Sequence, residues 1–234
     1  PLDGGAAPGL RSALGLFCAV RRVRSFAPAL PSRHPGMDVV VIRETEEDLP
    51  CGPEHRQTED VAQALKRISR PACRRVCRFA FAWAEAADRR RVACVTKANA
   101  MPITDGLFRE VFGEVAAEHP ALSADALLVD TAAARLAEAP ERLDTLLAPN
   151  LYGDILADLA TGLAGHLQLG ASARHGTHAS VFEPIHGAAR PLAGRGAANP
   201  SGMLLAAAEM LRHLGQGAAA ARVENAWART IEDG

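Results

Sequence analysis

The sequence predicts an α/β fold, because short apolar runs alternate with longer segments of helical spacing. The run at 38–44, DVVVIRE, is almost continuously apolar, which is typical of a strand buried on both faces of a parallel sheet. Residues 71–87 place apolar side chains on one helical face, and residues 201–214 form a second clear helical segment. No internal repeat interrupts this alternation. We therefore expect strands and helices to share one α/β architecture.

The composition narrows the class of protein. With 234 residues, 48% hydrophobic and 23% charged, the chain can bury the core of one large or two smaller domains. A formal net charge of −1 gives no electrostatic case for binding nucleic acid or an anionic membrane. No apolar run has the length of a membrane span, and no signal peptide is recognisable. The five cysteines include no CxxC pair, so we expect a cytoplasmic protein with reduced thiols, and the opening proline suggests a fragment.

We expect the first quarter of the chain to begin with an irregular stretch and then to contain a helix, a loop and a strand in turn. Residues 1–9 hold too much glycine and proline for a regular element. Leu10–Val20 has helical spacing and leads into several arginines, whose simplest interpretation is a solvated basic face. A proline-rich loop at 27–36 precedes the strand at 38–44, and the polar stretch 45–60 predicts a loop or a short hairpin.

Strands and helices keep alternating after this stretch. Pro71 suits the first position of a helix that we expect to run to Ala87. Asn199 is expected to cap the last helix and Gly215 to end it, with glycine- and histidine-rich loops before it. The other expected elements are strands at 91–96 and 127–130, and helices at 104–119, at 132–137 and from 150 onward.

Charged side chains follow the ends of several expected strands. Arg43, Lys97 and Asp130 all occupy such positions, and ligands bind at the ends of strands in open α/β sheets. Arginines, a lysine and aspartates gathered at one rim would suit a polycarboxylate bound together with a divalent ion.

Asp154 and Asp158 lie four residues apart, so both carboxylates project from one face of the expected helix. Such a pair is most often a solvated helix face. The alternative is a site for a hard cation such as Mg²⁺, which prefers oxygen ligands. Spacing alone leaves both interpretations open. The histidines at 166, 175, 178 and 186 are more simply explained as solvated or core residues than as metal ligands.

Four motifs together resemble one known family. They are Asn150–Asp158 (NLYGDILAD), Val40–Glu44 (VVIRE), Thr96–Asn99 (TKAN) and Phe182–Gly187 (FEPIHG). The set is similar to the metal-dependent β-decarboxylating dehydrogenases, which include isocitrate, 3-isopropylmalate, homoisocitrate and tartrate dehydrogenases. Within that family, the segments 54–63 and 224–234 are most similar to one bacterial type of isocitrate dehydrogenase.

The resemblance implies an isopropylmalate-dehydrogenase-like two-domain fold, truncated in this chain. Residues 19–159 are expected to form the small domain, which carries dimerisation, substrate and metal binding. Residues 1–18 and 160–234 are expected to form part of the large, cofactor-side domain. The resemblance also implies a homodimer whose two subunits share their active sites.

The resemblance further assigns roles to individual residues. The substrate carboxylates would be bound by Arg11, Arg21 and Arg43, and the metal by Asp154, Asp158 and, from the partner subunit, Asp130. Lys97, also acting in the partner's site, would be the catalytic residue that helps to remove the proton of the 2-hydroxyl. The cofactor-binding residues would be Asn99, His186, Gly187, Arg190 and Asn199.

The implied reaction is the oxidation and decarboxylation of isocitrate to 2-oxoglutarate, with NADP or NAD and with Mg²⁺ or Mn²⁺. One alternative is a non-catalytic or truncated paralogue that still dimerises or binds ligand. A second keeps the chemistry and changes the substrate to 3-isopropylmalate or a tartrate-like acid.

The chain departs from the family pattern at four places. Pro50 stands where the resembled enzymes carry a tyrosine that is thought to protonate the enol product. Gly5 and Ala7 replace a serine and an asparagine before the first arginine, and Arg190 is shifted from the usual cofactor-reading position. The first strand and glycine-rich turn of the large domain, and the last part of its C-terminus, are also expected to be missing.

Overall fold

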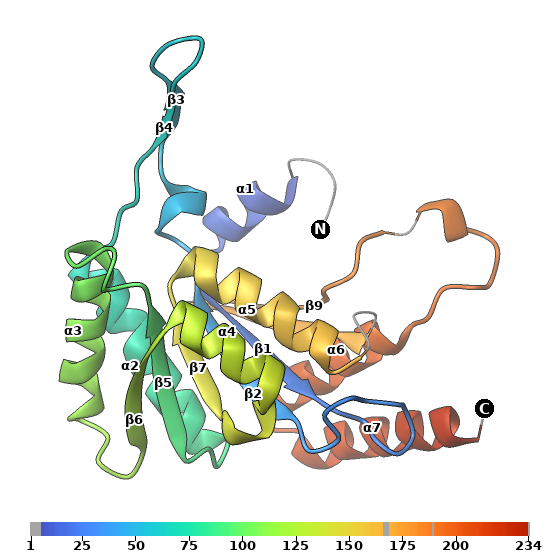
Figure 1. Cartoon of the computed structure of the whole chain (residues 1–234). Coiled ribbons are helices and arrows are strands. Elements are labelled where there is room, and N and C mark those ends of the chain that lie inside the picture. Colours follow the sequence, from blue (N-terminus) through green and yellow to red (C-terminus); the bar gives the residue numbers. More distant parts are fainter. Residues whose placement is uncertain (1–5, 166–168, 189, 234) are drawn as a thin grey trace.

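The computed structural model describes residues 6–165, 169–188 and 190–233, and in these residues seven strands form one mixed sheet (Figure 1). The strand order is β6-β5-β7-β2-β1-β8-β9. The strands are β1 (Leu16–Arg24), β2 (Asp38–Glu44), β5 (Arg91–Thr96), β6 (Ser123–Leu128), β7 (Thr145–Ala148), β8 (Ala171–Gly176) and β9 (Ser180–Pro184). The expected α/β fold is confirmed.

The sheet has a parallel half and an antiparallel half. Strands β6, β5, β7 and β2 run parallel, joined by helical crossovers. Strand β1 then pairs antiparallel with β2, and β8 and β9 continue in antiparallel fashion. The parallel half is the part in which strand ends carry site residues, as open α/β sheets favour.

Helices cover both faces of the sheet (Figure 1). Helices α2 and α3 pack on one face, and α4 and α5 pack on the other. The helices of the described residues are α1 (Ala6–Ala13), α2 (Arg70–Ala86), α3 (Thr104–Ala116), α4 (Val129–Glu138), α5 (Asn150–Leu163), α6 (Ser201–His213) and α7 (Gly217–Glu232). Short 3₁₀ turns occur at Leu49–Cys51, Pro140–Arg142 and Arg190–Leu192.

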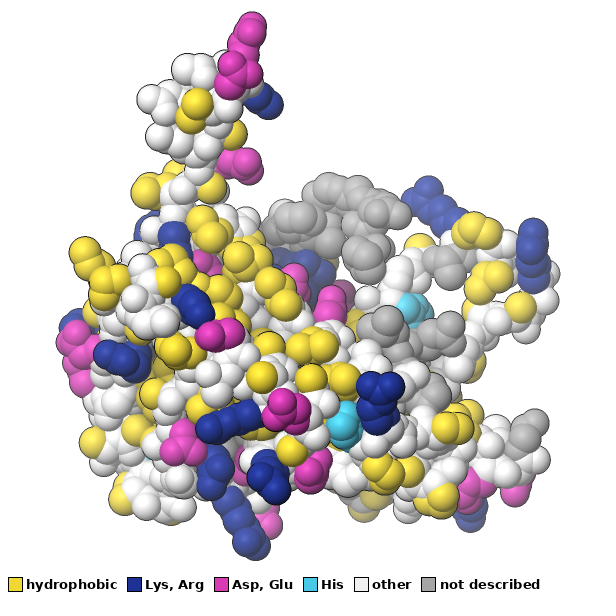
Figure 2. Space-filling model, viewed as in Figure 1, with side chains coloured by type: hydrophobic (Ala, Val, Ile, Leu, Met, Phe, Trp, Pro, Cys, Tyr) yellow, Lys and Arg dark blue, Asp and Glu magenta, His cyan; other side chains and the backbone are white. Residues whose placement is uncertain are grey.

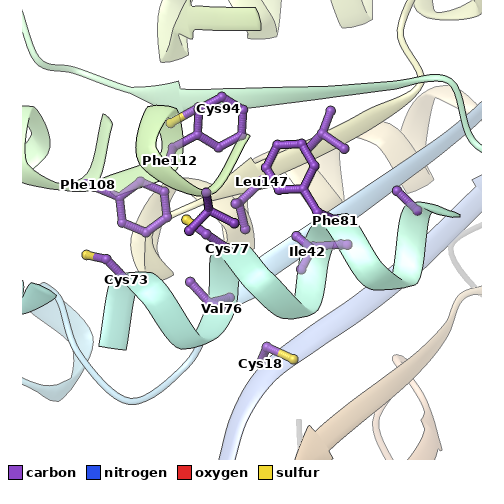
Figure 3. Packing of buried hydrophobic residues seen from close by; sticks show 14 of the residues in the cluster. Cys18, Ile42, Cys73, Val76, Cys77, Phe81, Cys94, Phe108, Phe112 and Leu147 are labelled. Carbon is purple, nitrogen blue, oxygen red and sulfur yellow. The ribbon is translucent and has the colours of Figure 1, made fainter. Parts of the chain in front are cut away.

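Strand β2 explains why both faces are apolar. Val40 and Ile42 point into the core beneath α2 and α3, whereas Val39 and Val41 point into the core beneath α4 and α5. All four are essentially fully buried, as expected for successive side chains on a strand covered by helices on both sides. Figure 3 shows the first of these cores, where rings from α2 and α3 fill the space above the sheet.

Two expectations for the N-terminal part were wrong. Helix α1 begins inside the stretch expected to be irregular, and the helix expected over Leu10–Val20 is replaced by α1 and strand β1. Gly15, with φ of +57°, makes the turn between them. Leu16–Val20 is a continuous buried run between two neighbouring strands, and this burial outweighs the helical spacing that starts at Leu10.

Three further elements differ from expectation. The glycine- and histidine-rich region contains the β8–β9 hairpin, and α7 follows α6. Strand β6 ends at Leu128, so Asp130 lies in the first turn of α4 and not at the end of a strand. Gly5, His166 and Ala189 lie outside the described residues.

A hairpin projects away from the body of the molecule (Figures 1 and 2). Its strands β3 (Glu54–Arg56) and β4 (Ala62–Ala64) pair only with each other among the described residues. Every residue from 54 to 65 is exposed. This confirms the expected hairpin within 45–60 and extends it to residue 64.

Within the described residues, no helix is both long enough and apolar enough to cross a membrane.

Candidate functional site

Arg43 lies near the end of β2, against the start of α5. Its Nε donates a hydrogen bond to Oδ1 of Asn150 at 2.8 Å, and its guanidinium also pairs with Asp154. Asn150 donates in turn to the backbone carbonyl of Glu47 at 2.9 Å. The Arg43 side chain is only 18% exposed, so it is fixed between the sheet and the helix.

Gly153 lets α5 approach Arg43 closely. A Cβ at this position would lie 2.7 Å from Cβ and 2.8 Å from Cγ of Arg43, too close for two carbon atoms. The glycine of the motif is therefore required by the packing of α5 on β2.

Arg21 makes the second arginine–carboxylate contact with the same helix. It extends from β1 and pairs with Asp158, whose side chain is 63% exposed. The structure therefore brings together four predicted site residues on the exposed face of α5: Arg21, Arg43, Asp154 and Asp158.

Arg11 reaches the same region through residues that the sequence did not single out. Its guanidinium lies 3.2 Å from Oε1 of Glu183, and Nε of Arg174 donates to the same oxygen at 2.7 Å. Burial lowers the pKa of Arg43; Asp154 opposes this, while the charges of Arg174, Arg21 and Arg11 add to the lowering. The charges of these arginines thus act on one small volume. Glu183 could have been found from the sequence, because it belongs to the FEPIHG motif. Arg174 could not, because its segment was expected to be a loop.

Lys97 and Asp130 form a separate pair. The Lys97 Nζ lies 2.8 Å from Oδ1 of Asp130, and this hydrogen bond lowers the pKa of the carboxyl group. Among the described residues, no three histidine, cysteine, aspartate or glutamate side chains are placed to hold one metal ion. Asp130 therefore does not join Asp154 and Asp158 within a single chain.

The predicted cofactor residues lie on exposed loops. Asn99 is in the turn after β5, and His186, whose ring Nδ1 lies 3.1 Å from the Gly187 carbonyl oxygen, follows β9. Arg190 is exposed on a short 3₁₀ turn. Asn199 accepts a hydrogen bond from the Ser201 amide at 3.0 Å just before α6. The N-cap position is occupied by Pro200 and α6 begins at Ser201, so the expected cap was one residue too early. Among the described residues, no hydrogen bond or ion pair joins these residues to Arg11, Arg21 or Arg43.

The chemistry of the donor set fits a hard cation and a polycarboxylate. Asp154 and Asp158 present oxygen atoms, which Mg²⁺ and Mn²⁺ prefer, and both are at least 47% exposed. Arg21 and Arg43 are planar, permanently charged donors that match carboxylate groups. A bound cation can replace the arginines as the partner of the aspartates, leaving the arginines free to bind substrate.

Glu44, beside Arg43, gives a prediction about pH. Burial raises the pKa of this 3% exposed carboxyl group from 4.5 to about 7, although the amides of Glu46 and Glu47 donate to it. Because the folded state holds the proton more tightly, this stabilisation is present below pH 4.5 and is lost as the pH rises to 7. Glu44→Gln, which stays neutral, should therefore gain stability relative to the wild type between pH 4.5 and pH 8. Urea unfolding at the two pH values measures this, and an unchanged difference between the two proteins would contradict the assignment.

Residues 6–234 match the model of the isocitrate/isopropylmalate dehydrogenase family. The chain is 44% identical over 225 residues to isocitrate dehydrogenase [NADP] of Rickettsia prowazekii, covering 96% of this chain and 47% of that protein. It is 42% identical to 3-isopropylmalate dehydrogenase of Archaeoglobus fulgidus, covering 96% of this chain and 68% of that protein. The chain thus spans about half the length of the rickettsial relative.

Solved structures agree with this match. The isocitrate dehydrogenase of Methylococcus capsulatus superposes with a TM-score of 0.91 at 39% identity, over 100% of this chain and 71% of that one. A protein of Thermus thermophilus gives 0.92 at 41% identity, over 100% of this chain and 48% of that one. The match covers nearly every described element, including the strands and helix that carry the arginine–aspartate contacts. The chain therefore belongs to the isocitrate/isopropylmalate dehydrogenase family.

Proposed function

We propose that this chain supplies the substrate- and metal-binding part of an enzyme that oxidatively decarboxylates isocitrate to 2-oxoglutarate. The observation that carries the proposal is the pairing of Arg21 and Arg43, from neighbouring strands, with the two carboxylates on one face of α5. The relatives named isocitrate dehydrogenase [NADP] support isocitrate and favour NADP over NAD.

The roles of the residues follow from their chemistry. Arg21 and Arg43, with Arg11 nearby, bind the substrate carboxylates and orient the carbon that loses its hydride. Asp154 and Asp158 hold Mg²⁺ or Mn²⁺, and the bound ion and nicotinamide supply Lewis-acid polarisation and a hydride acceptor. Lys97, held by Asp130 at 2.8 Å, helps to remove the proton of the 2-hydroxyl.

Two other functions remain in competition. The relative from Archaeoglobus fulgidus supports the same chemistry on 3-isopropylmalate. A non-catalytic paralogue is favoured by Pro50, which is exposed in the turn Leu49–Cys51 and has no proton to donate.

Metal-dependent stabilisation tests the proposed site. Mn²⁺ with isocitrate should raise the melting temperature by mass action, with about 2.7 kcal/mol of stabilisation at a hundredfold excess over Kd. Asp158→Asn should remove most of this shift, because it removes one of two carboxylate ligands. Asp125→Asn is a matched control, since Asp125 also pairs with an arginine at the surface, Arg91, at 3.3 Å. Equal shifts of the melting temperature in both variants would refute the proposal that the carboxylates of α5 bind the metal.

We further propose that the enzyme is a homodimer with shared active sites. The separation of the Lys97–Asp130 pair from the α5 carboxylates supports this, since each subunit would then contribute two different half-sites. The projecting hairpin also supports it, because a lone two-stranded ribbon is only marginally stable in water. Residues 19–159 would be the dimer-forming domain, although one sheet joins strands from both proposed domains. The five free cysteines fit a cytoplasmic location.

Subunit mixing tests the sharing of sites. Lys97→Met and Asp158→Asn proteins should each be inactive, and mixed heterodimers should recover activity because one of their two sites contains both native residues. Activity with isocitrate, Mn²⁺ and NADP measures the recovery, and mixtures of differently tagged copies of one variant serve as controls. Absence of recovery despite proven subunit exchange would mean that each site is built within one chain.

A further inference from the structure

Lys66 forms a buried ion cluster that the proposed chemistry does not use. Its Nζ lies 2.5 Å from Oδ1 of Asp105 and 3.2 Å from Oδ1 of Asp48. Both aspartate side chains are fully buried, and that of Lys66 is only 9% exposed. The ammonium group also lies 4.8 Å from the centre of the Tyr152 ring. We call Lys66, Asp48 and Asp105 the buried triad.

The Asp48 arm of the buried triad holds the start of helix α5. Oδ2 of Asp48 accepts a hydrogen bond from the Leu151 amide at 2.8 Å. It therefore caps, from a distant segment, the helix that carries Asp154 and Asp158. Asp48 itself has φ of +73°, a conformation that an aspartate keeps only where its surroundings hold it.

The Asp105 arm holds the turn that carries Lys97. Oδ2 of Asp105 accepts a hydrogen bond from the Lys97 amide at 2.6 Å. Lys66 thus joins two carboxylates whose other oxygens fix the backbone at Lys97 and at the start of α5.

The charge of the triad argues against a purely stabilising role. Burial lowers the pKa of Lys66, but the interaction with Asp105 and the charge of Asp48 outweigh burial, so the pKa is raised and the ammonium form persists. The triad therefore holds one ammonium group between two buried carboxyl groups. Apolar residues of similar volume often stabilise a fold as well as a buried ion cluster does. What such residues cannot supply is the set of directed contacts to Leu151 and Lys97.

We propose that the buried triad is a positioning device that fixes the Lys97 turn relative to helix α5. This inference rests on the proposed function of those two elements. If the sites are shared between subunits, Lys97 serves one active site and α5 the other, so the triad links the two half-sites within each chain.

Two variants separate positioning from stability. Lys66→Met leaves two buried carboxylates without their cation and should lower the melting temperature. Lys66→Met combined with Asp105→Leu leaves one buried carboxyl group, that of Asp48, in place of two, so part of the lost stability should come back. The acceptor for the Lys97 amide is still absent in the double variant, so positioning should stay impaired. Arg78→Met, which removes a surface ion pair with Glu118 at 3.2 Å, is the control for loss of a cation.

The readouts use the fact that the sequence contains only two lysines, Lys66 and Lys97. Reductive methylation followed by peptide mass spectrometry therefore reports Lys97 directly, without metal, substrate or turnover. The methylation rate of Lys97 should rise in both Lys66 variants, because Lys97 then leaves Asp130. The rate should stay at the wild-type value in Arg78→Met. Mn²⁺ affinity in the presence of isocitrate should weaken by about 10–100-fold in both Lys66 variants.

Each outcome decides the proposal. A folded double variant with wild-type methylation rate and Mn²⁺ affinity would show that the triad only stabilises the fold. If the double variant does not fold, the same two readouts in Lys66→Met decide between positioning and stability. Failure of the wild type to bind Mn²⁺ counts against the proposed function, whereas the methylation rates still decide the positioning role.

Discussion

Replacing Gly153 with alanine should lower the free energy of unfolding by about 1–3 kcal/mol, the usual cost of overpacking. The new Cβ would lie 2.7 Å from Cβ and 2.8 Å from Cγ of Arg43, so helix α5 must move away from β2. Because Arg43 holds Asn150 and Asp154, this movement should also weaken Mn²⁺ and isocitrate binding. Urea unfolding and Mn²⁺ titration measure the two effects.

The same helix offers a matched control. A Cβ at Gly162 would meet nothing within 4 Å, apart from its neighbours in the helix. Gly162→Ala should therefore stabilise the protein by about 0.5–1 kcal/mol, the ordinary gain from removing a glycine inside a helix. If both alanine variants change the stability in the same direction, Gly153 is not needed for the close approach of α5 to Arg43.

Local patterns predicted the parallel half of the fold well. Strand β2 has the bounds expected from its apolar run, and α2 starts within one residue of Pro71 as expected. Strand β1 was missed because its identity depends on its neighbours: Leu16–Val20 is buried between β2 and β8. The β8–β9 hairpin was missed for a related reason, since half-buried polar side chains such as Arg174 and Glu183 hide the alternation of the strands.

The residues of the candidate site were proposed from the sequence, but the contacts between them were not. The family resemblance pointed to Arg21, Arg43, Asp154 and Asp158, and the spacing of the two aspartates correctly placed both carboxylates on one helical face. Sequence spacing contains no information on pairs that lie more than a hundred residues apart, such as Arg43 with Asp154.

The buried triad was missed for the same reason. Lys66 lies 18 residues after Asp48 and 39 before Asp105 in the sequence, and nothing in its surroundings marks it as buried. A lysine next to an arginine is ordinarily read as exposed, because charged side chains are rarely buried unless paired.

The turn that contains Pro50 is fixed to the beginning of helix α5. Asp48 accepts from the Leu151 amide, and Sγ of Cys51 accepts from Nδ2 of Asn150 at 3.4 Å, so the residues on both sides of Pro50 contact the beginning of α5. Asn150 in turn binds Arg43, which places this turn beside the proposed substrate site. Pro50 itself is exposed, so a larger side chain there displaces no core residue.

Pro50→Tyr should therefore raise kcat on isocitrate by about 10²–10⁴-fold, the usual contribution of a positioned acid, with little change in KM. In the proposed reaction, oxidation would require Lys97, the metal and the nicotinamide, whereas protonation of the enol after loss of CO₂ is the step that the tyrosine would serve. Pro50→Ala is the matched control, because alanine relaxes the backbone and donates no proton. An equal gain in both variants would assign the effect to the backbone. If neither variant turns over isocitrate while both bind it with Mn²⁺, the non-catalytic alternative is correct, because the binding half of the site is then intact and the acid alone does not restore the chemistry.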